Sequence, residues 1–244
     1  MIAQTSAEFL KIRSTRTTLG LLAGMIALLL LFVLLTGLLA TAQSLSDRQD
    51  QLGLLSVGSL AGVFSALAGI MLVTSEYRFG TIRPTFLFTP RRERVLVAKL
   101  VAAVLAGLVF GVVGEGLNLA IGTVILDGRG IPIALSGGDI AVLVIGTLAG
   151  VALWGGIGVG VGTILRNQVG AVVGLLAWGF VAENLLFAFV PSVGRLGPAH
   201  ASDAMTGIDT DHLLAPLAGA GVLIAWTLVL GLIGLVLTLR RDVD

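Results

Sequence analysis

The chain consists of six long apolar runs separated by short polar segments. The runs cover residues 19–42, 52–73, 95–126, 140–165, 169–190 and 213–239. Each run can cross the roughly 30 Å hydrocarbon core of a bilayer, which takes about 20 helical residues. Because the runs are continuously apolar and lack the ten-residue alternation of barrel strands, they predict helices. The pattern therefore predicts an all-α polytopic membrane protein with six transmembrane helices, forming a single domain over residues 1–244.

The composition supports lipid as the solvent for most of the surface. Hydrophobic residues make up 56% of the chain and charged residues only 12%, whereas soluble domains carry roughly 25% charged residues. The first run has 24 residues, more than the roughly 7–15 apolar residues of a signal peptide, so we expect it to remain as the first span. The chain has no cysteine, which excludes disulfides, thiol catalysis and thiolate metal sites.

The distribution of Lys and Arg predicts the orientation, since cytoplasmic segments of membrane proteins are enriched in both. With the N-terminus inside, the inner segments hold twelve basic residues, and the outer loops hold only Arg48, Arg129 and Arg195. Both termini are therefore predicted to be cytoplasmic, in a multi-pass protein of a bacterial-type plasma membrane. No basic patch with interleaved aromatic residues lies outside the inner loops, so nucleic acid is not an expected partner.

Two segments outside the spans have their own character. Residues 1–18 mix apolar and basic side chains, which favours an amphipathic helix on the inner headgroups over a disordered basic tail. Residues 191–212 form the longest outer loop, with a possible short helix from Pro198, both histidines (His200 and His212) and three aspartates including Asp203. No metal-ligand spacing such as His-Glu-x-x-His occurs there, so we expect an acidic, solvated extracellular loop.

Two glycine-rich stretches are better explained by packing and capping than by nucleotide binding. The run Gly-Gly-Ile-Gly-Val-Gly-Val-Gly at 155–162 lies inside an apolar span, where small residues four apart let helix backbones approach closely. Residues 135–139, Leu-Ser-Gly-Gly-Asp, are similar to the signature of ABC-type ATPases, but the chain has no Gly-Lys pair and hence no Walker A motif. Ser136 or Asp139 is instead predicted to cap a helix.

Two carboxylates inside spans require an explanation, because a charge near mid-bilayer costs about 2.5–3.5 kcal/mol on insertion scales. Glu115 and Glu183 lie at similar depths in the third and fifth runs, with Asn118 and Asn184 near them, so they are candidates for one intramembrane site. Either they hold helices together with at least one carboxyl protonated, or they line a translocation path that contacts a cationic or hydroxylated substrate or relays protons. The mid-span tryptophans 154, 178 and 226 predict core packing, with a pocket wall as the alternative.

The most polar stretch of the chain runs from residue 74 to 99 and holds six of the fifteen basic residues. Residues 74–94 are predicted to form a cytoplasmic loop. Anionic lipid would attract its arginines, but its uncharged centre at 79–82 and the apolar residues 86–88 indicate a surface that binds a protein.

This stretch resembles the membrane subunits of type-2 ABC transporters. The pattern is Glu76-x-x-x-Gly80-Thr81-Ile82-Arg83-x-Thr85, followed by Pro90-x-Arg92 and Ala98-Lys99. The basic N-terminal helix, the six spans, the long outer loop before the last span and the Leu-Arg-Asn-Gln at 165–168 are also similar to this family.

The resemblance implies a permease that pairs with a second copy of itself or a similar chain and binds two copies of a separate ABC ATPase. ATP and Mg would bind that partner, and this chain would carry no catalytic residue, cofactor or metal. It also implies short re-entrant helices between spans five and six. The residues it assigns to coupling with the ATPase are Glu76, Tyr77, Arg78, Phe79, Gly80, Thr81, Ile82 and Arg83.

The expected function is export of an amphipathic or lipid-like compound such as a drug or antibiotic. The alternative is a proton-coupled secondary transporter that uses Glu115 and Glu183, although the sequence shows no convincing inverted repeat. An intramembrane enzyme is disfavoured because no His or Cys lies in any apolar run.

Overall fold

The computed structural model describes residues 2–88, 91–208 and 212–240, and within these ranges the regular structure is entirely helical. Six helical segments are long and apolar enough to cross a membrane: Arg16–Leu39, Arg48–Arg78, Arg92–Gly128, Gly137–Leu165, Gln168–Phe189 and Pro216–Arg240. These segments overlap all six apolar runs of the sequence. The predicted all-helical, six-span architecture is therefore confirmed.

Two of the six segments are interrupted, and short helices flank the others. The second segment breaks into α3, η2 and α4, and the fifth contains one π-helical stretch, η3. The elements in chain order are α1 (Ile2–Ser14), α2 (Arg16–Leu39), η1 (Ser44–Ser46), α3 (Arg48–Leu55), η2 (Val57–Leu60), α4 (Ala61–Arg78), α5 (Ile82–Phe88), α6 (Arg92–Gly128), α7 (Gly137–Leu165), α8 (Gln168–Ala177), η3 (Trp178–Ala182), α9 (Glu183–Phe189), α10 (Pro191–Gly194), α11 (Pro198–Met205) and α12 (Pro216–Arg240).

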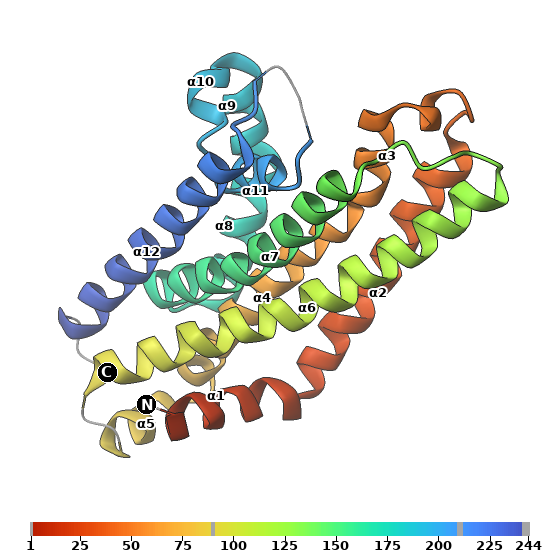
Figure 1. Ribbon diagram of the computed structural model, residues 1–244. Coiled ribbons are helices and arrows are strands. Elements are labelled where there is room, and N and C mark those ends of the chain that lie inside the picture. Colours follow the sequence, from red (N-terminus) through yellow and green to blue (C-terminus); the bar gives the residue numbers. More distant parts are fainter. Residues whose placement is uncertain (1, 89–90, 209–211, 241–244) are drawn as a thin grey trace.

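Helix α7 lies at the centre of the bundle, packed against α4, α6 and α12 (Figure 1). Its glycines make this packing possible, because a Cβ at Gly158 would collide with the backbone of Ala66 on α4, and one at Gly160 would collide with Leu230 on α12. The packing role predicted for the glycine run is therefore confirmed. At the start of α7, Ser136 and Asp139 form a reciprocal capping box, so the predicted cap is confirmed and both residues take part in it.

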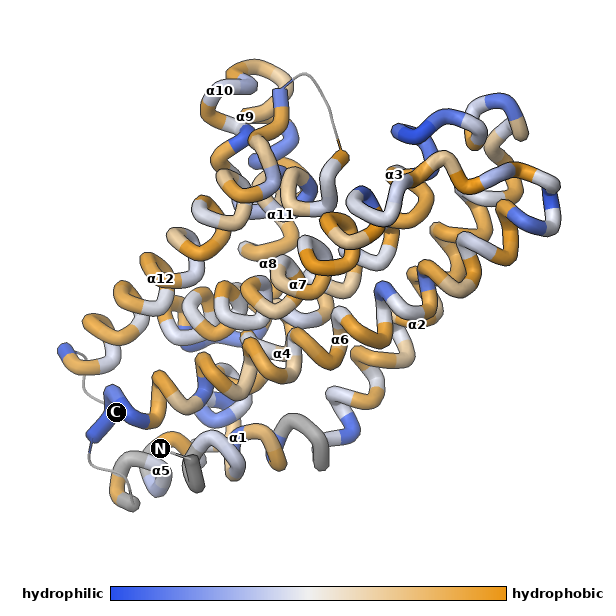
Figure 2. Tube along the Cα trace, in the orientation of Figure 1, coloured by the Kyte–Doolittle hydropathy of each residue, from blue (hydrophilic) through white to orange (hydrophobic). Residues whose placement is uncertain are grey.

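The outer helices present apolar faces outward. Only 11% of the most apolar stretch of the fifth segment is buried, against 56% of that of α7. Hydrophobic residues run along all the long helices, whereas hydrophilic residues concentrate toward the two ends of the bundle (Figure 2). This distribution is the one that a bilayer requires, since apolar side chains on the lipid-facing surface cost nothing in hydrocarbon.

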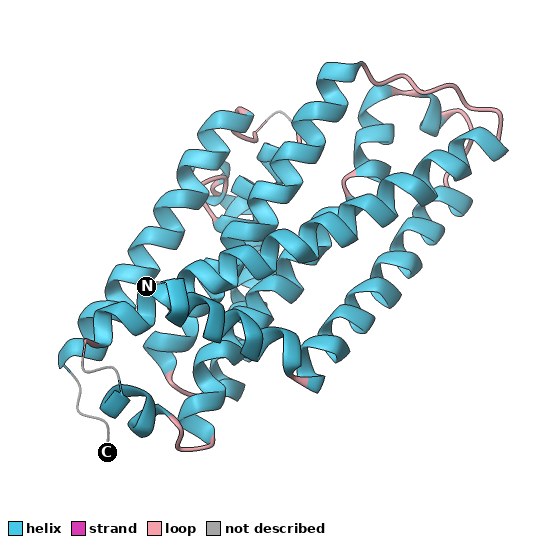
Figure 3. Ribbon diagram, turned by 60° about the horizontal axis from the view of Figure 1, so that its bottom comes forward, coloured by secondary structure: helices cyan, strands magenta, loops and turns pink. Residues whose placement is uncertain are grey.

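The bundle has two distinct ends. Helices α1 and α5 lie at one end with the C-terminal part of α12, and we call this the basic end; α3, α10 and α11 lie at the other, which we call the α11 end (Figure 1). Helix α1 runs across the basic end and packs against α2, α4 and α6 (Figure 3). The predicted N-terminal helix is thus present over Ile2–Ser14, and its contact with headgroups stays a prediction.

Candidate functional site

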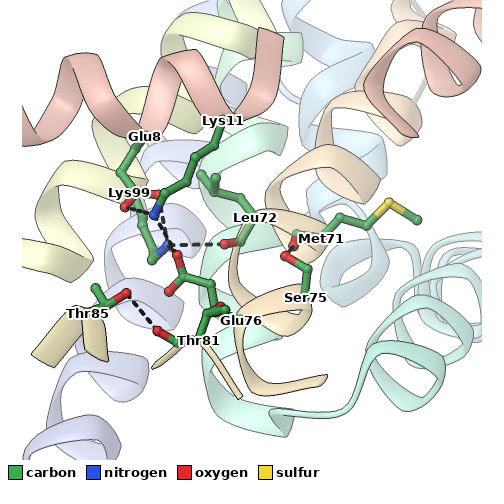
Figure 4. Close-up of polar contacts among 9 residues, drawn as sticks. All are labelled: Glu8, Lys11, Met71, Leu72, Ser75, Glu76, Thr81, Thr85 and Lys99. Carbon is green, nitrogen blue, oxygen red and sulfur yellow. Dashed lines mark hydrogen bonds and ion pairs between the residues drawn. The ribbon is translucent and has the colours of Figure 1, made fainter. Parts of the chain in front are cut away.

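Four charged side chains form a closed cluster where α1 crosses α4 and α6 (Figure 4). The Lys99 Nζ of α6 lies 2.8 Å from an oxygen of Glu8 on α1 and 2.8 Å from an oxygen of Glu76 on α4. The Lys11 Nζ of α1 lies 2.8 Å from each of the same two carboxylates. Lys99 also donates a hydrogen bond to the Leu72 carbonyl, at 3.2 Å. The cluster therefore joins three helices.

The four charges balance each other in a place where unpaired charges would be costly. Lys99, Glu8 and Glu76 are only 2%, 5% and 6% exposed, and a buried charge is tolerated only when it is paired and hydrogen-bonded. At Lys11, partial burial lowers the pKa, but hydrogen bonds and charges from Glu76 and Glu8 outweigh this effect and raise the pKa overall. The two carboxylates therefore favour the charged form of Lys11.

This cluster contains two residues of the polar stretch at 74–99, Glu76 and Lys99, and changes the roles expected for them. The resemblance assigns Glu76 to a docking surface and includes Lys99 in the family-like pattern, and the structure places both side chains in the interior. Sequence reasoning did not single out Glu8. Only a weak signal in the sequence pointed to Glu8. It is an acidic residue in a basic segment, and it precedes Lys11 by three positions, a spacing at which two side chains on a helix can interact.

The remaining predicted coupling residues form the turn between α4 and α5. Phe79 is 71% exposed, and Gly80 has φ of 69°, which favours glycine and ends α4. Thr81 is exposed as well, whereas Ile82, the first residue of α5, is buried. The Arg83 side chain lies outside the described residues. The exposed part of the predicted docking surface thus centres on Phe79, Gly80 and Thr81.

Two side chains next to this turn contact the turn between α7 and α8. Arg78 donates a hydrogen bond to the Gln168 Oε1, at 3.3 Å. The Arg166 guanidinium lies over the Tyr77 ring, 5.1 Å from its centroid. The end of α4 and residues 165–168, which both carry the family resemblance, are therefore neighbours in space.

A cavity of about 670 Å³ opens beside the cluster at the basic end. Lys11, Thr15, Arg78, Thr81 and Thr85 are among its lining residues, with an apolar floor from α2 and α4. The hydroxyl of Thr85 is already engaged, since it donates to the Thr81 carbonyl at 2.9 Å (Figure 4).

The intramembrane Glu115 faces the break in the second segment. Its side chain is 1% exposed, and neither oxygen makes a hydrogen bond of normal geometry to a described residue, although the Thr147 hydroxyl of α7 lies near it. It occupies the space that a side chain at Gly58 would fill. One turn later, the Asn118 amide donates to the carbonyls of Leu54 and Leu55, which are left without helical partners where α3 ends. Asn118 therefore stabilises the break.

Glu183 has different surroundings at the α11 end. It is fully buried, and its Oε1 accepts a hydrogen bond from the His200 backbone N–H at 2.8 Å and lies 3.2 Å from the His200 Nδ1. The His200 ring stacks on Phe187, with centroids 4.1 Å apart. Asn184 is exposed and donates to the Gly179 and Phe180 carbonyls of the π-helical stretch. Among the described residues, no hydrogen bond or ion pair joins Glu183 to Glu115.

The segment before the last span is more deeply packed than a solvated loop. On α11, Ser202 contacts Gly150 of α7 and Ala201 contacts Gly219 of α12. Gly150 is 13 residues into α7, or about 20 Å along its axis. The expectation of a solvated loop is therefore wrong for His200, which sequence reasoning did not connect to Glu183. Within the described ranges, no group of three potential metal ligands occurs.

The three tryptophans meet around one apolar cavity. Trp154, Trp178 and Trp226 all line a space of about 330 Å³ between α7, α8 and α12. The Trp178 and Trp226 ring centroids lie 6.3 Å apart, and the Trp226 Nε1 donates to the Leu196 carbonyl at 2.8 Å. Trp154 is buried, but Trp178 is 41% exposed, so the structure favours the pocket wall that the sequence left as the alternative.

The described residues thus bring together a paired charge cluster with an exposed turn at one end and buried carboxylates beside cavities toward the other. A scan against models of known protein families finds no match to this chain, and a search of curated proteins finds none either. The charge cluster can couple the movements of helices, and the cavities can hold a ligand.

Proposed function

We propose that the chain is the permease subunit of an ATP-driven exporter of the type-2 ABC class, with both termini cytoplasmic in a plasma membrane. Two permease chains, identical or similar, would bind two copies of a separate ATPase that carries ATP and Mg. The observation that supports this most is the exposed Phe79-Gly80-Thr81 turn. This turn lies within the segment where the family resemblance is most specific. It is next to the α7–α8 turn, which also carries part of the resemblance.

The contacts around this turn supply a physical route for coupling. Helix α4 continues from the turn into the packed centre of the bundle against α7. Glu76, three residues before Phe79, is tied through Lys99 and Lys11 to α6 and α1. A displacement of the turn by an ATPase would therefore move three helices together, because densely packed interiors transmit strain. In this proposal the chain transmits force and the partner performs the ATP chemistry.

The cavities support the proposed substrate class. The two cavities of about 350 and 330 Å³ lie among the long helices and are mainly apolar, and pockets of roughly this size hold small ligands. We propose an amphipathic or lipid-like substrate such as a drug or antibiotic.

Purification of the chain from its native host tests the ATPase partnership. A soluble ATPase should co-purify, and Phe79→Glu and Arg78→Glu should each remove it. Arg195→Glu, an exposed position near the α11 end, is the matched control and should retain the partner. Retention of the ATPase by all three variants would place the docking surface elsewhere, and its absence from the unmodified complex would contradict the proposal.

A proton-coupled secondary transporter is the second candidate, because both Glu115 oxygens and one Glu183 oxygen are buried without a hydrogen-bond partner among the described residues. It predicts uptake into proteoliposomes driven by a pH gradient with this chain alone. The double variant Glu115→Gln/Glu183→Gln should abolish that uptake and leave assembly intact. Uptake that requires ATP and a second protein would exclude this candidate.

A further inference from the structure

The second cavity of the bundle lies toward the α11 end and combines aromatic and polar walls. It measures about 350 Å³ and is bounded by α2, the broken second segment, the π-helical stretch and α11. Phe32, Trp154 and Phe180 contribute aromatic rings from three different segments, while Ser59 and Asp203 contribute polar groups. Its walls therefore come from elements that are far apart in the sequence.

Asp203 gives this cavity a negative charge that the protein does not neutralise. Its side chain is exposed to the cavity, and its carboxylate makes no hydrogen bond or ion pair with a described residue. Among the described residues that line the cavity there is no lysine or arginine. His200, one turn before Asp203, contacts Glu183 instead and makes no hydrogen bond or ion pair with the Asp203 carboxylate among the described residues.

A carboxylate beside aromatic rings is a chemistry that recognises organic cations. The faces of aromatic rings attract a cation through their quadrupole, and a carboxylate attracts it more strongly where the surroundings have a low dielectric. A bare metal ion would need several converging ligands, and within the described ranges no group of three His, Cys, Asp or Glu residues forms one. An organic anion would meet an unpaired like charge.

We propose that this cavity binds an amphipathic organic cation, with Asp203 as the counter-charge and Phe32, Trp154 and Phe180 as the aromatic walls. The role of such a cation as the exported substrate rests on the proposed function, whereas its binding does not. The cavity volume lies at the lower end of the roughly 300–1,000 Å³ range of ligand pockets. One cation per cavity is therefore expected.

The test compares two probes of the same shape and opposite charge. Binding of tetraphenylphosphonium and of tetraphenylborate to the purified full chain in neutral detergent is measured by equilibrium dialysis, with protein-free micelles subtracted. Tetraphenylphosphonium should bind saturably, and Asp203→Asn should weaken its binding about tenfold, the size expected when a charged partner is lost. Asp203→Glu should retain it, as should Asp127→Asn, an exposed aspartate outside this cavity.

A second variant covers the case in which Asp203→Asn does not fold. Ser59→Lys places a cation in the cavity wall and should abolish tetraphenylphosphonium binding without touching Asp203. Equal binding of both probes, or unchanged tetraphenylphosphonium binding in a folded Asp203→Asn or Ser59→Lys protein, overturns the inference. No ATPase is present in this assay, so cation binding can hold while the exporter proposal fails, and an ATPase can co-purify while cation binding fails.

Discussion

The two ends of the bundle surround their carboxylates in opposite ways. At the basic end, Glu8 and Glu76 are paired with Lys11 and Lys99 in a neutral cluster. Toward the α11 end, the contacts of Glu183 are with one histidine, His200. The Asp203 carboxylate makes no hydrogen bond or ion pair with a described residue. Glu115, between the ends, likewise makes no hydrogen bond of normal geometry to a described residue.

The difference teaches which carboxylates can respond to something outside the chain. A fully paired cluster is held in one geometry, because moving any member exposes an uncompensated charge. A carboxylate without a partner is instead free to meet a proton or a cation. The contrast assigns a structural role to the cluster at the basic end and a binding role to the cavity near α11.

Removal of Lys99 should have the largest effect, because it leaves two buried glutamates with only half-exposed Lys11. Lys99→Met should lower the free energy of unfolding by about 3–5 kcal/mol, the cost of breaking a buried ion pair. The measurement is unfolding of the purified protein in mixed micelles by added SDS. Lys11→Met is the control and should cost clearly less. Equal losses for the two variants would show that the cluster does not depend on the buried lysine.

Crowding the contact between α7 and α11 should have the next largest effect. A Cβ at Gly146 would collide with the Met205 carbonyl, so Gly146→Ala should destabilise the protein by about 1–3 kcal/mol and displace α11. Tetraphenylphosphonium binding should fall with it, since α11 carries Asp203. Gly116→Ala, where nothing lies within 4 Å, should leave stability and binding unchanged. Normal binding by Gly146→Ala would separate the cavity from the position of α11.

Substitution of the two intramembrane glutamates should change the free energy of unfolding by smaller amounts, and by different amounts for the two residues. Glu183→Gln weakens the interaction with His200 and should cost about 1–2 kcal/mol in the same unfolding assay. Glu115→Gln keeps the shape of a side chain whose oxygens have no hydrogen-bond partner in the described part of the chain, so it should change stability by less than about 1 kcal/mol. The reverse order would indicate that Glu115 carries the structural contact.

The smallest effect expected is a pH dependence of cation binding. Asp203 is exposed to the cavity, but the surrounding protein limits its contact with water. This desolvation raises the pKa of Asp203 to about 6. The charge of His200 lowers that pKa, and the charge of Glu183 raises it. The ionised form that binds a cation is therefore present above this pKa and lost below it. Between pH 8 and pH 5, tetraphenylphosphonium affinity should fall about fivefold, because about a tenth of the Asp203 carboxyl stays ionised at pH 5 and the protonated form should bind about tenfold more weakly. An Asp203→Asn protein should lose the part that Asp203 contributes, and a pH-independent affinity in the unmodified chain would contradict this assignment.

Local pattern was sufficient for the spans and for their glycine contacts. The six runs needed only length and hydrophobicity, because every polar backbone group in a bilayer must be satisfied within a helix. The helix cap at Ser136 or Asp139 was predicted from residue type next to an apolar run, and the packing role of Gly158 and Gly160 was predicted from small residues four apart. Such features follow from neighbours along the chain.

The candidate sites were predicted less completely. Glu115 and Glu183 stood out because a charge in an apolar run is conspicuous, but nothing local indicated that His200 would contact Glu183 from 17 residues away. Glu8 and Lys99 are 91 residues apart, so neither could be recognised as half of an ion pair. Asn118 was noted for its nearness to Glu115, and its bonds to Leu54 and Leu55 required the break in another helix.

The sequence by itself determined that this protein is a six-helix membrane bundle with a polar, family-like stretch at 74–99, because hydrophobic length and charge are properties of the chain alone. Only the tertiary structure decided what that stretch is. Because α1 crosses α4 and α6, Glu76 and Lys99 are buried in a cluster of paired charges. Phe79, Gly80 and Thr81 remain exposed. Burial of a charge depends on which partners the fold delivers, and those partners come from distant positions.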